Sequence, residues 1–257
     1  MANYRSGAGN PAKTLRLLWR NIIESPGKRG PRPALSIDRI VETAVGLADR
    51  EGLDAVTMRG LAERLEVAPM TLYTYVPGKG ELLDLMLDQL YADMPRPDRT
   101  DRTWRDRVEA IAHDNHALFI DHPWAATVAT TRPPLGPGQM AKYEYELRAF
   151  DGTGLGDVDR DAALTFVLQF VRVTALAAAE ARAAQEESSL DDEQWWAEHG
   201  PLLNEVLDET VYPTAARVGS AAGAAHGAAY SAEHAYEFGL MRVLDGLGTL
   251  IDRQRDR

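Results

Sequence analysis

The sequence contains no cysteine, so a disulfide scaffold and a thiolate metal site are both excluded. It also lacks a long uninterrupted apolar run, because the most apolar stretch, residues 162–179, contains Gln169 and Arg172. The N-terminus is basic but has no apolar segment of the kind that a secretory signal requires. We therefore expect a cytoplasmic protein with no membrane span.

Motifs typical of enzymes are also missing. There is no G-x-S-x-G nucleophile elbow and no G-x-x-x-x-G-K-[ST] phosphate loop. The glycines of GTGLG at 152–156 follow no predicted strand, so an interhelical turn is expected there. His113 and His116 share a helical face in HDNHALFIDH, but this cluster has neither the HExxH arrangement nor a clear fourth ligand. The sequence thus indicates no enzyme, metal or cofactor; an all-helical metal-dependent enzyme is the alternative.

Strand-like alternation of apolar and polar residues is absent as well, and the apolar residues recur at helical spacing. Ser36 is a suitable N-cap for the first strong helix, and Gly52 suits its end. Residues 214–229 are rich in alanine and glycine and are compatible with helix or loop. The predicted fold is all-α, with helices over residues 37–51, 57–65, 69–76, 80–95, 104–120, 123–129, 139–150, 158–185, 195–207 and 231–252.

The stretch from Thr57 to Lys79 follows a helix-turn-helix plan. Apolar residues within 61–65 form one helical face, and Leu72 and Val76 give a second short helix its own apolar side. The outward positions of that second helix carry hydroxyl groups and flat apolar surface instead of charge. This composition predicts a contact surface formed by Met70, Thr71, Tyr73, Thr74 and Tyr75.

Charge is distributed unevenly along the chain, whose net charge is -11. Residues 1–33 carry a net charge of +6, whereas residues 34–93 carry -6. The proline- and glycine-rich segment SPGKRGPRP, with Arg29 and Arg32, predicts an extended basic arm along DNA; a solubilising disordered tail is the alternative. We therefore divide the chain into a basic arm (1–33), a DNA-binding domain (34–93) and a larger helical domain (94–257).

The segment LAERLEVAPMTLYTYVPGKGELLDLM, preceded by ADREGLDAVTMRG, resembles the DNA-binding domain of TetR-family transcriptional repressors over residues 36–92. Leu72, Tyr73, Val76 and Lys79 fall at the family's characteristic positions, and Glu66 stands where the family usually has glycine. The segment GPRPALS and the Trp104 helix resemble the tetracycline-repressor-like subgroup. This resemblance implies an all-helical second domain that dimerises and binds a small effector.

For the first domain, the resemblance implies that Arg59 reaches a base edge or phosphate and that Lys79 meets the DNA backbone. Arginine can bind guanine with two hydrogen bonds, threonine and methionine can pack on thymine methyl groups, and tyrosine hydroxyls bind phosphate. The alternatives are a core role for Tyr73, a solvated charge for Arg59 and a purely helix-capping role for Thr57. The expected DNA contacts are Thr57, Arg59, Met70, Thr71, Tyr73, Thr74, Tyr75, Lys79, Arg29 and Arg32.

Polar residues within the apolar second domain are candidates for effector contacts. Gln169 and Arg172 interrupt an apolar helix, so they either face a pocket or bridge to a partner subunit. We favour the pocket, with the candidate set Asn115, His116, Trp124, Arg132, Tyr143, Gln169 and Arg172.

The function that these observations favour is a homodimeric transcriptional regulator of operator DNA. The hypothesis is a repressor that a small-molecule effector releases from its operator, with the helices at 158–185 and 231–252 forming the dimer. An activator, or a regulator that needs no ligand, is the alternative within the same class.

Overall fold

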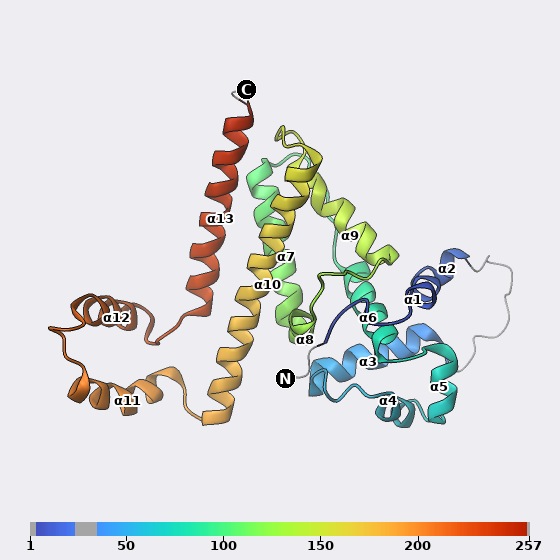
Figure 1. Cartoon of the computed structure of the whole chain (residues 1–257), viewed down its shortest axis with the longest axis horizontal. Coiled ribbons are helices and arrows are strands. Elements are labelled where there is room, and N and C mark those ends of the chain that lie inside the picture. The colour runs from blue at the N-terminus through green and yellow to red at the C-terminus, as the bar shows by residue number, and fades with distance from the viewer. Residues whose placement is uncertain (1–3, 24–34, 256–257) are drawn as a thin grey trace.

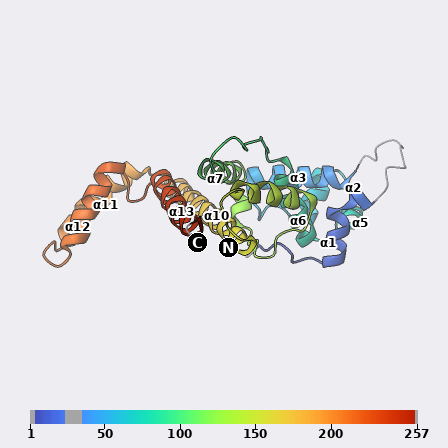
Figure 2. The ribbon, with the colours of Figure 1, turned by 90° about the horizontal axis from the view of Figure 1, so that it is seen from above.

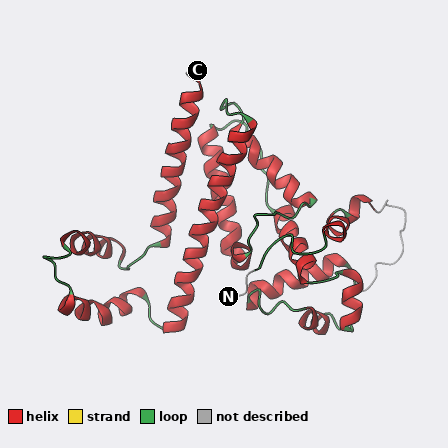
Figure 3. Cartoon of the chain, viewed as in Figure 1, coloured by secondary structure: helices red, strands yellow, loops and turns green. Residues whose placement is uncertain are grey.

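The computed structural model describes residues 4–23 and 35–255. All the regular elements in these ranges are helical, so the predicted all-α fold is confirmed (Figure 3). The described residues contain one isolated parallel β-bridge, which pairs Arg5 with Ala129.

Three helices form the helix-turn-helix unit: α3 (Ile37–Glu51), α4 (Met58–Arg64) and α5 (Pro69–Tyr75). The Ser36 side chain caps α3 by accepting a hydrogen bond from the Arg39 amide, and Gly52 ends the helix with a φ of 79°. Proline at the first position of α5 leaves no hydrogen bond unmade, because an amide there has no partner within the helix. The predicted boundaries of these helices are therefore confirmed to within about two residues.

Glu66, in the turn between α4 and α5, has a φ of 56°. Few residues other than glycine adopt this left-handed conformation without strain. Glu66 therefore holds a left-handed conformation at the position where the family usually has glycine.

The connecting helix α6 (Lys79–Asp93) leads into the larger domain. Residues 214–229, left open from the sequence, are mostly helical, and the end of the predicted 139–150 helix tightens into a 3₁₀ turn, η1. The remaining elements are α7 (Trp104–Asp121), α8 (Pro123–Thr127), α9 (Pro137–Leu147), η1 (Arg148–Phe150), α10 (Asp157–Ser188), α11 (Asp192–Val206), α12 (Pro213–His226) and α13 (Ala232–Arg255).

Two apolar cores hold the molecule together. One lies mainly among α3, α4, α5 and α6, but it also contains Leu118, Trp124, Ala125 and Val128 from the larger domain. The other is formed mainly by α7, α10 and α13. The first core therefore crosses the domain boundary predicted at residue 93.

Residues 4–19, which we call the N-terminal strap, pack along α6. The strap contains helix α1 (Pro11–Leu18), whose Leu18 is buried in the first core, and it is followed by α2 (Arg20–Ile23). The Trp19 indole donates a hydrogen bond of 2.7 Å to the Leu135 carbonyl of the larger domain. Residues 4–23 thus do not form a free arm. The arm prediction rests on residues 25–33, which include Arg29 and Arg32. These residues lie outside the part of the chain that the structure describes.

Helices α10 and α13 are long and lie side by side, whereas α11 and α12 project from the body at the end opposite α5 (Figures 1 and 2). Helix α10 is long and apolar enough to cross a membrane by length and composition, and 28% of its most apolar window is buried in the single chain. Exposed apolar side chains on this pair of helices include Phe166, Val173, Phe238 and Met241. Either a second copy of the chain or lipid could cover these exposed side chains. The absence of a membrane span therefore stays a prediction.

Candidate functional site

Helix α5 presents an uncharged face to solvent. Leu72 and Val76 are fully buried and anchor the helix on α3, α4 and α6. Opposite them, Met70 is 74% exposed and Tyr73 is 44% exposed. Thr71 and Thr74 lie on the same open surface. Four of the five outward positions predicted on this helix are therefore available to a partner, which excludes a core role for Tyr73.

Tyr75 differs from the other four. It is half-buried and packs against the first apolar core. Tyr75 is therefore less open than the other four outward positions, and its contact with DNA stays a prediction. The sequence pattern contains no signal for this packing, since it depends on neighbours outside α5.

Two residues at the start of α4 show contrasting roles. The Thr57 hydroxyl accepts a hydrogen bond of 3.0 Å from the Gly60 amide and caps the helix. The Arg59 side chain is 85% exposed, and its Nε lies 3.2 Å from a Glu63 carboxylate oxygen. Exposed ion pairs of this kind contribute about 0 to 1 kcal/mol to the free energy of folding. The Arg59 guanidinium can therefore exchange its glutamate partner for a phosphate or a base edge at little cost.

Lys79 is bound within the chain. Its Nζ donates hydrogen bonds of 3.2 Å to the Tyr4 hydroxyl and 3.1 Å to the Leu53 carbonyl, and burial lowers its pKa. The Tyr4 hydroxyl in turn donates to Asp54, and this hydrogen bond helps raise the pKa of Tyr4 to about 12. Tyr4 and Leu53 thus hold the Lys79 ammonium group in place, and its contact with the DNA backbone stays a prediction.

The seven candidate effector residues do not gather around one cavity. His116 lines a cavity of about 390 Å³ between α7, α10 and α13. Trp124 and Arg172 instead make internal hydrogen bonds, to the Asp49 carboxylate and the Ala126 carbonyl respectively. Tyr143 donates to Asp161 at 2.7 Å. Arg132 and Gln169 are exposed, and the contact of Gln169 with an effector stays a prediction.

Asn115 belongs to a buried polar network that the sequence pattern did not indicate. Its Nδ2 donates to a Glu146 carboxylate oxygen at 2.6 Å, and the same carboxylate pairs with Lys142 at 2.6 Å. The side chains of Lys142 and Glu146 are only 8% and 3% exposed. In the sequence, a Lys and a Glu four positions apart resemble an ordinary surface pair. Burial of this pair depends on how α9 packs on α6 and α7.

The two clustered histidines contact an aromatic ring. His113 Nδ1 lies 3.1 Å from the Tyr236 hydroxyl, and the His116 ring stacks on Tyr236 with a centroid distance of 4.0 Å. Burial lowers the pKa of His116, with the neighbouring His113 contributing. Within the described ranges, no three His, Cys, Asp or Glu residues are grouped closely enough to hold a metal ion.

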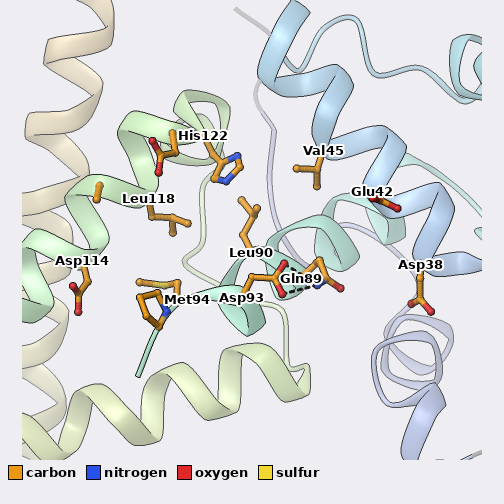
Figure 4. Close-up of a pocket in the computed structure, with 13 residues that line it drawn as sticks. Asp38, Glu42, Val45, Gln89, Leu90, Asp93, Met94, Asp114, Leu118 and His122 are labelled. Carbon is orange, nitrogen blue, oxygen red and sulfur yellow. Dashed lines mark hydrogen bonds between the residues drawn. The ribbon is translucent and has the colours of Figure 1, made fainter. Parts of the chain in front are cut away.

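A cavity of about 600 Å³ lies where the two domains meet, between α3, α6 and α7 (Figure 4). Its apolar wall includes Val45, Leu90, Met94 and Leu118. Carboxylates from all three helices also line it. A ligand in this interdomain cavity would contact both the DNA-binding unit and the larger domain.

The three-helix unit, whose third helix α5 presents an exposed, uncharged face, is joined to a larger helical domain and defines a helix-turn-helix DNA-binding protein. Residues 40–86 match the model of bacterial regulatory proteins of the tetR family, and residues 96–251 match the tetracyclin repressor-like C-terminal domain. The chain therefore belongs to the TetR family, and it is a DNA-binding transcriptional regulator.

Individual relatives agree with this assignment. The chain is 39% identical to the HTH-type transcriptional repressor DrrR1 of Streptomyces coeruleorubidus, over 97% of this chain and 90% of that protein. Apo ActR from Streptomyces coelicolor is 30% identical and superposes with a TM-score of 0.68, covering 86% of this chain and 98% of ActR. ActR in complex with actinorhodin superposes with a TM-score of 0.69 at 28% identity, covering 83% of this chain and 95% of ActR.

Proposed function

We propose that this protein is a homodimeric repressor that a small-molecule effector releases from its operator. The observation that carries DNA binding is the solvent-facing surface of α5. Met70 and Tyr73 are exposed there, while Leu72 and Val76 are buried and hold the helix in place. This surface has no charged side chain, so it suits methyl groups and base edges in a major groove. Arg59 supplies the adjacent cation, and the whole protein acts in the cytoplasm.

Repression and ligand response are supported by the relatives. DrrR1 is named a repressor, and ActR is described in complex with actinorhodin. Two copies of the chain would place their recognition helices in successive major grooves, about 34 to 36 Å apart on a near-palindromic site. An effector that prefers a differently spaced dimer would weaken DNA binding by its differential affinity for that form.

A gel shift with the DNA flanking the protein's own gene tests this function. Wild-type protein should retard a fragment, and Arg59→Ala should weaken binding by about five- to tenfold, as expected for loss of one charged contact. Tyr73→Phe should weaken it less, because only the hydroxyl is removed. Arg105→Ala is the matched control, since Arg105 carries the same charge but pairs with Asp245 in the larger domain. Equal weakening by Arg59→Ala and Arg105→Ala would contradict a specific role for α4.

A reporter under the same operator separates repression from the alternatives. Deletion of the gene should raise expression if the protein represses, whereas an activator would give the opposite change. A regulator that needs no ligand would stay bound to the operator whichever cell extract is added to the DNA complex.

A further inference from the structure

A cavity of about 450 Å³ lies between the connection after α6, helix α7 and the end of α9. Four arginines line it: Arg96, Arg99, Arg107 and Arg148. The same cavity is lined by only two carboxylates. The chain as a whole carries a net charge of -11, so the charge of this arginine cavity is opposite in sign to that of the whole chain. A local surplus of cations is therefore a specific feature of this site.

Internal contacts leave the charge of two of these arginines uncompensated. Arg96 donates to the carbonyls of Tyr91, Ala92 and Met94, and Arg107 donates to those of Arg102, Ala149 and Asp151. Carbonyl oxygens hold a guanidinium in place but carry no net charge. Arg99 and Arg148 form ion pairs, whereas Arg96 and Arg107 have no carboxylate partner in the described parts of the chain. The cavity thus holds two fixed cations available to an anion.

The uncharged walls favour a flat apolar group. Ile111, Tyr145 and Ala149 line the cavity beside the arginines, and the Arg99 guanidinium lies 5.9 Å from the centre of the Tyr145 ring. Guanidinium planes and tyrosine rings both stack on aromatic surfaces. The volume also falls within the range typical of small-molecule sites, about 300 to 1,000 Å³.

We propose that the arginine cavity binds a planar aromatic carboxylate, and that, if the chain is a ligand-responsive repressor as proposed above, this chemical class is its effector. The arginine guanidinium groups would bind the carboxylate of the ligand, and the wall of the cavity that contains Tyr145 would pack against its aromatic ring.

The position of Arg99 connects this cavity to the DNA-binding unit. Arg99 binds the Asp114 carboxylate at 2.8 Å, and Asp114 also lines the interdomain cavity, whose opposite wall is α3 (Figure 4). A ligand carboxylate in the arginine cavity competes with Asp114 for Arg99. Occupancy therefore changes the charge balance of the interdomain cavity beneath α3.

Titration calorimetry of the full chain with four probes tests the ligand class. The probes are 1-hydroxy-2-naphthoate, its neutral counterpart 1-naphthol, the cation 1-naphthylmethylammonium and inorganic phosphate. The naphthoate should bind at least about tenfold more tightly than naphthol, because only the acid makes charged hydrogen bonds. Tighter binding of the cation or of naphthol would overturn the proposal. Phosphate binding as tight as that of the naphthoate would also overturn it, since it would indicate a simple ion site.

Variants place the ligand in the cavity. Arg148→Gln removes an exposed lining charge with little risk to folding, and Arg96→Gln removes a fixed cation. Each should weaken naphthoate binding by about three- to tenfold. Arg105→Gln, on α7 but outside the cavity, should leave binding unchanged, and so should Glu42→Gln in the interdomain cavity. Unchanged affinity in every variant that folds among Arg96→Gln, Arg107→Gln and Arg148→Gln would overturn the assignment of the site.

A parallel gel shift distinguishes this proposal from the proposed function. If the naphthoate binds the cavity but leaves the operator complex intact, the arginine site stands and its effector role falls. If another compound releases the operator while no naphthoate binds, the repressor function stands and the arginine site is overturned.

Discussion

At the scale of single residues, the turn before the recognition helix contains one strained position. Glu66 holds a left-handed backbone conformation that costs about 1 to 2 kcal/mol for a residue with a side chain. Glycine adopts this conformation freely but loses about 0.5 to 1 kcal/mol in chain entropy on folding. The cost of the left-handed conformation exceeds the entropy that glycine loses, so the turn is less stable with glutamate than it would be with glycine.

Glu66→Gly should therefore raise the free energy of unfolding by roughly 0.5 to 1 kcal/mol, as measured by urea denaturation. Glu63→Gly is the matched control, because Glu63 lies inside α4, where glycine costs about 1 kcal/mol. A loss of stability in both variants would show that the left-handed turn carries no strain.

Residue roles were predictable from the sequence where they depend on near neighbours. The burial of Leu72 and Val76 follows from helical spacing, and the capping role of Thr57 follows from its place before α4. The environment of Lys79 was not predictable, because its partner Tyr4 lies 75 positions away. Local pattern determines which face of a helix is apolar, but it does not determine which distant segment covers a polar residue.

At the scale of elements, three carboxylates on one side of α6 hold two separate segments. Glu81 accepts from the Asn10 amide at 2.8 Å, and Asp84 accepts from the Ser6 hydroxyl at 2.6 Å, both in the N-terminal strap. Asp88 accepts from the Gln139 amide at 2.8 Å, at the start of α9. Helix α6 is thus tied to the chain terminus and to the larger domain at once. Helical periodicity predicted α6 itself, but acidic residues within it gave no indication of burial.

Burial raises the pKa of the Asp84 carboxyl despite its hydrogen bonds to Ser6 and Gly7. A raised pKa means that the folded chain binds the proton more tightly than the unfolded chain, so stability falls as pH rises from the ordinary aspartate pKa through the raised one. The stability of Asp84→Asn relative to wild type should therefore increase as pH rises above the ordinary aspartate pKa of about 4. Thermal unfolding at several pH values measures this, with the exposed Asp93→Asn as control. A difference in stability between Asp84→Asn and wild type that stays constant or shrinks as pH rises would contradict the effect of burial.

At the scale of the whole molecule, α10 and α13 form the apolar surface opposite the DNA-binding end. Phe166 and Phe238 are 54% and 57% exposed in the single chain. Aromatic side chains of this size are typical anchors of protein interfaces. The broad apolar faces predicted for these two helices are present.

Phe166→Glu combined with Phe238→Glu should raise the dimer dissociation constant by roughly 30-fold or more, as loss of interface anchors does. Sedimentation at micromolar concentration measures the change. Met70→Glu places a charge on an apolar side chain of α5 that is even more exposed, and it should leave the assembly unchanged. If wild-type protein sediments only as a monomer, the dimer proposal is wrong.

The first apolar core draws Trp124 and Val128 of the larger domain into the helix-turn-helix unit. A fragment that ends at residue 93 would leave the apolar surface beneath these side chains open to water. The two parts of the chain are therefore not interchangeable modules. A chimera that joins this DNA-binding unit to the effector domain of another regulator must also carry α8, or supply side chains that fill the same space.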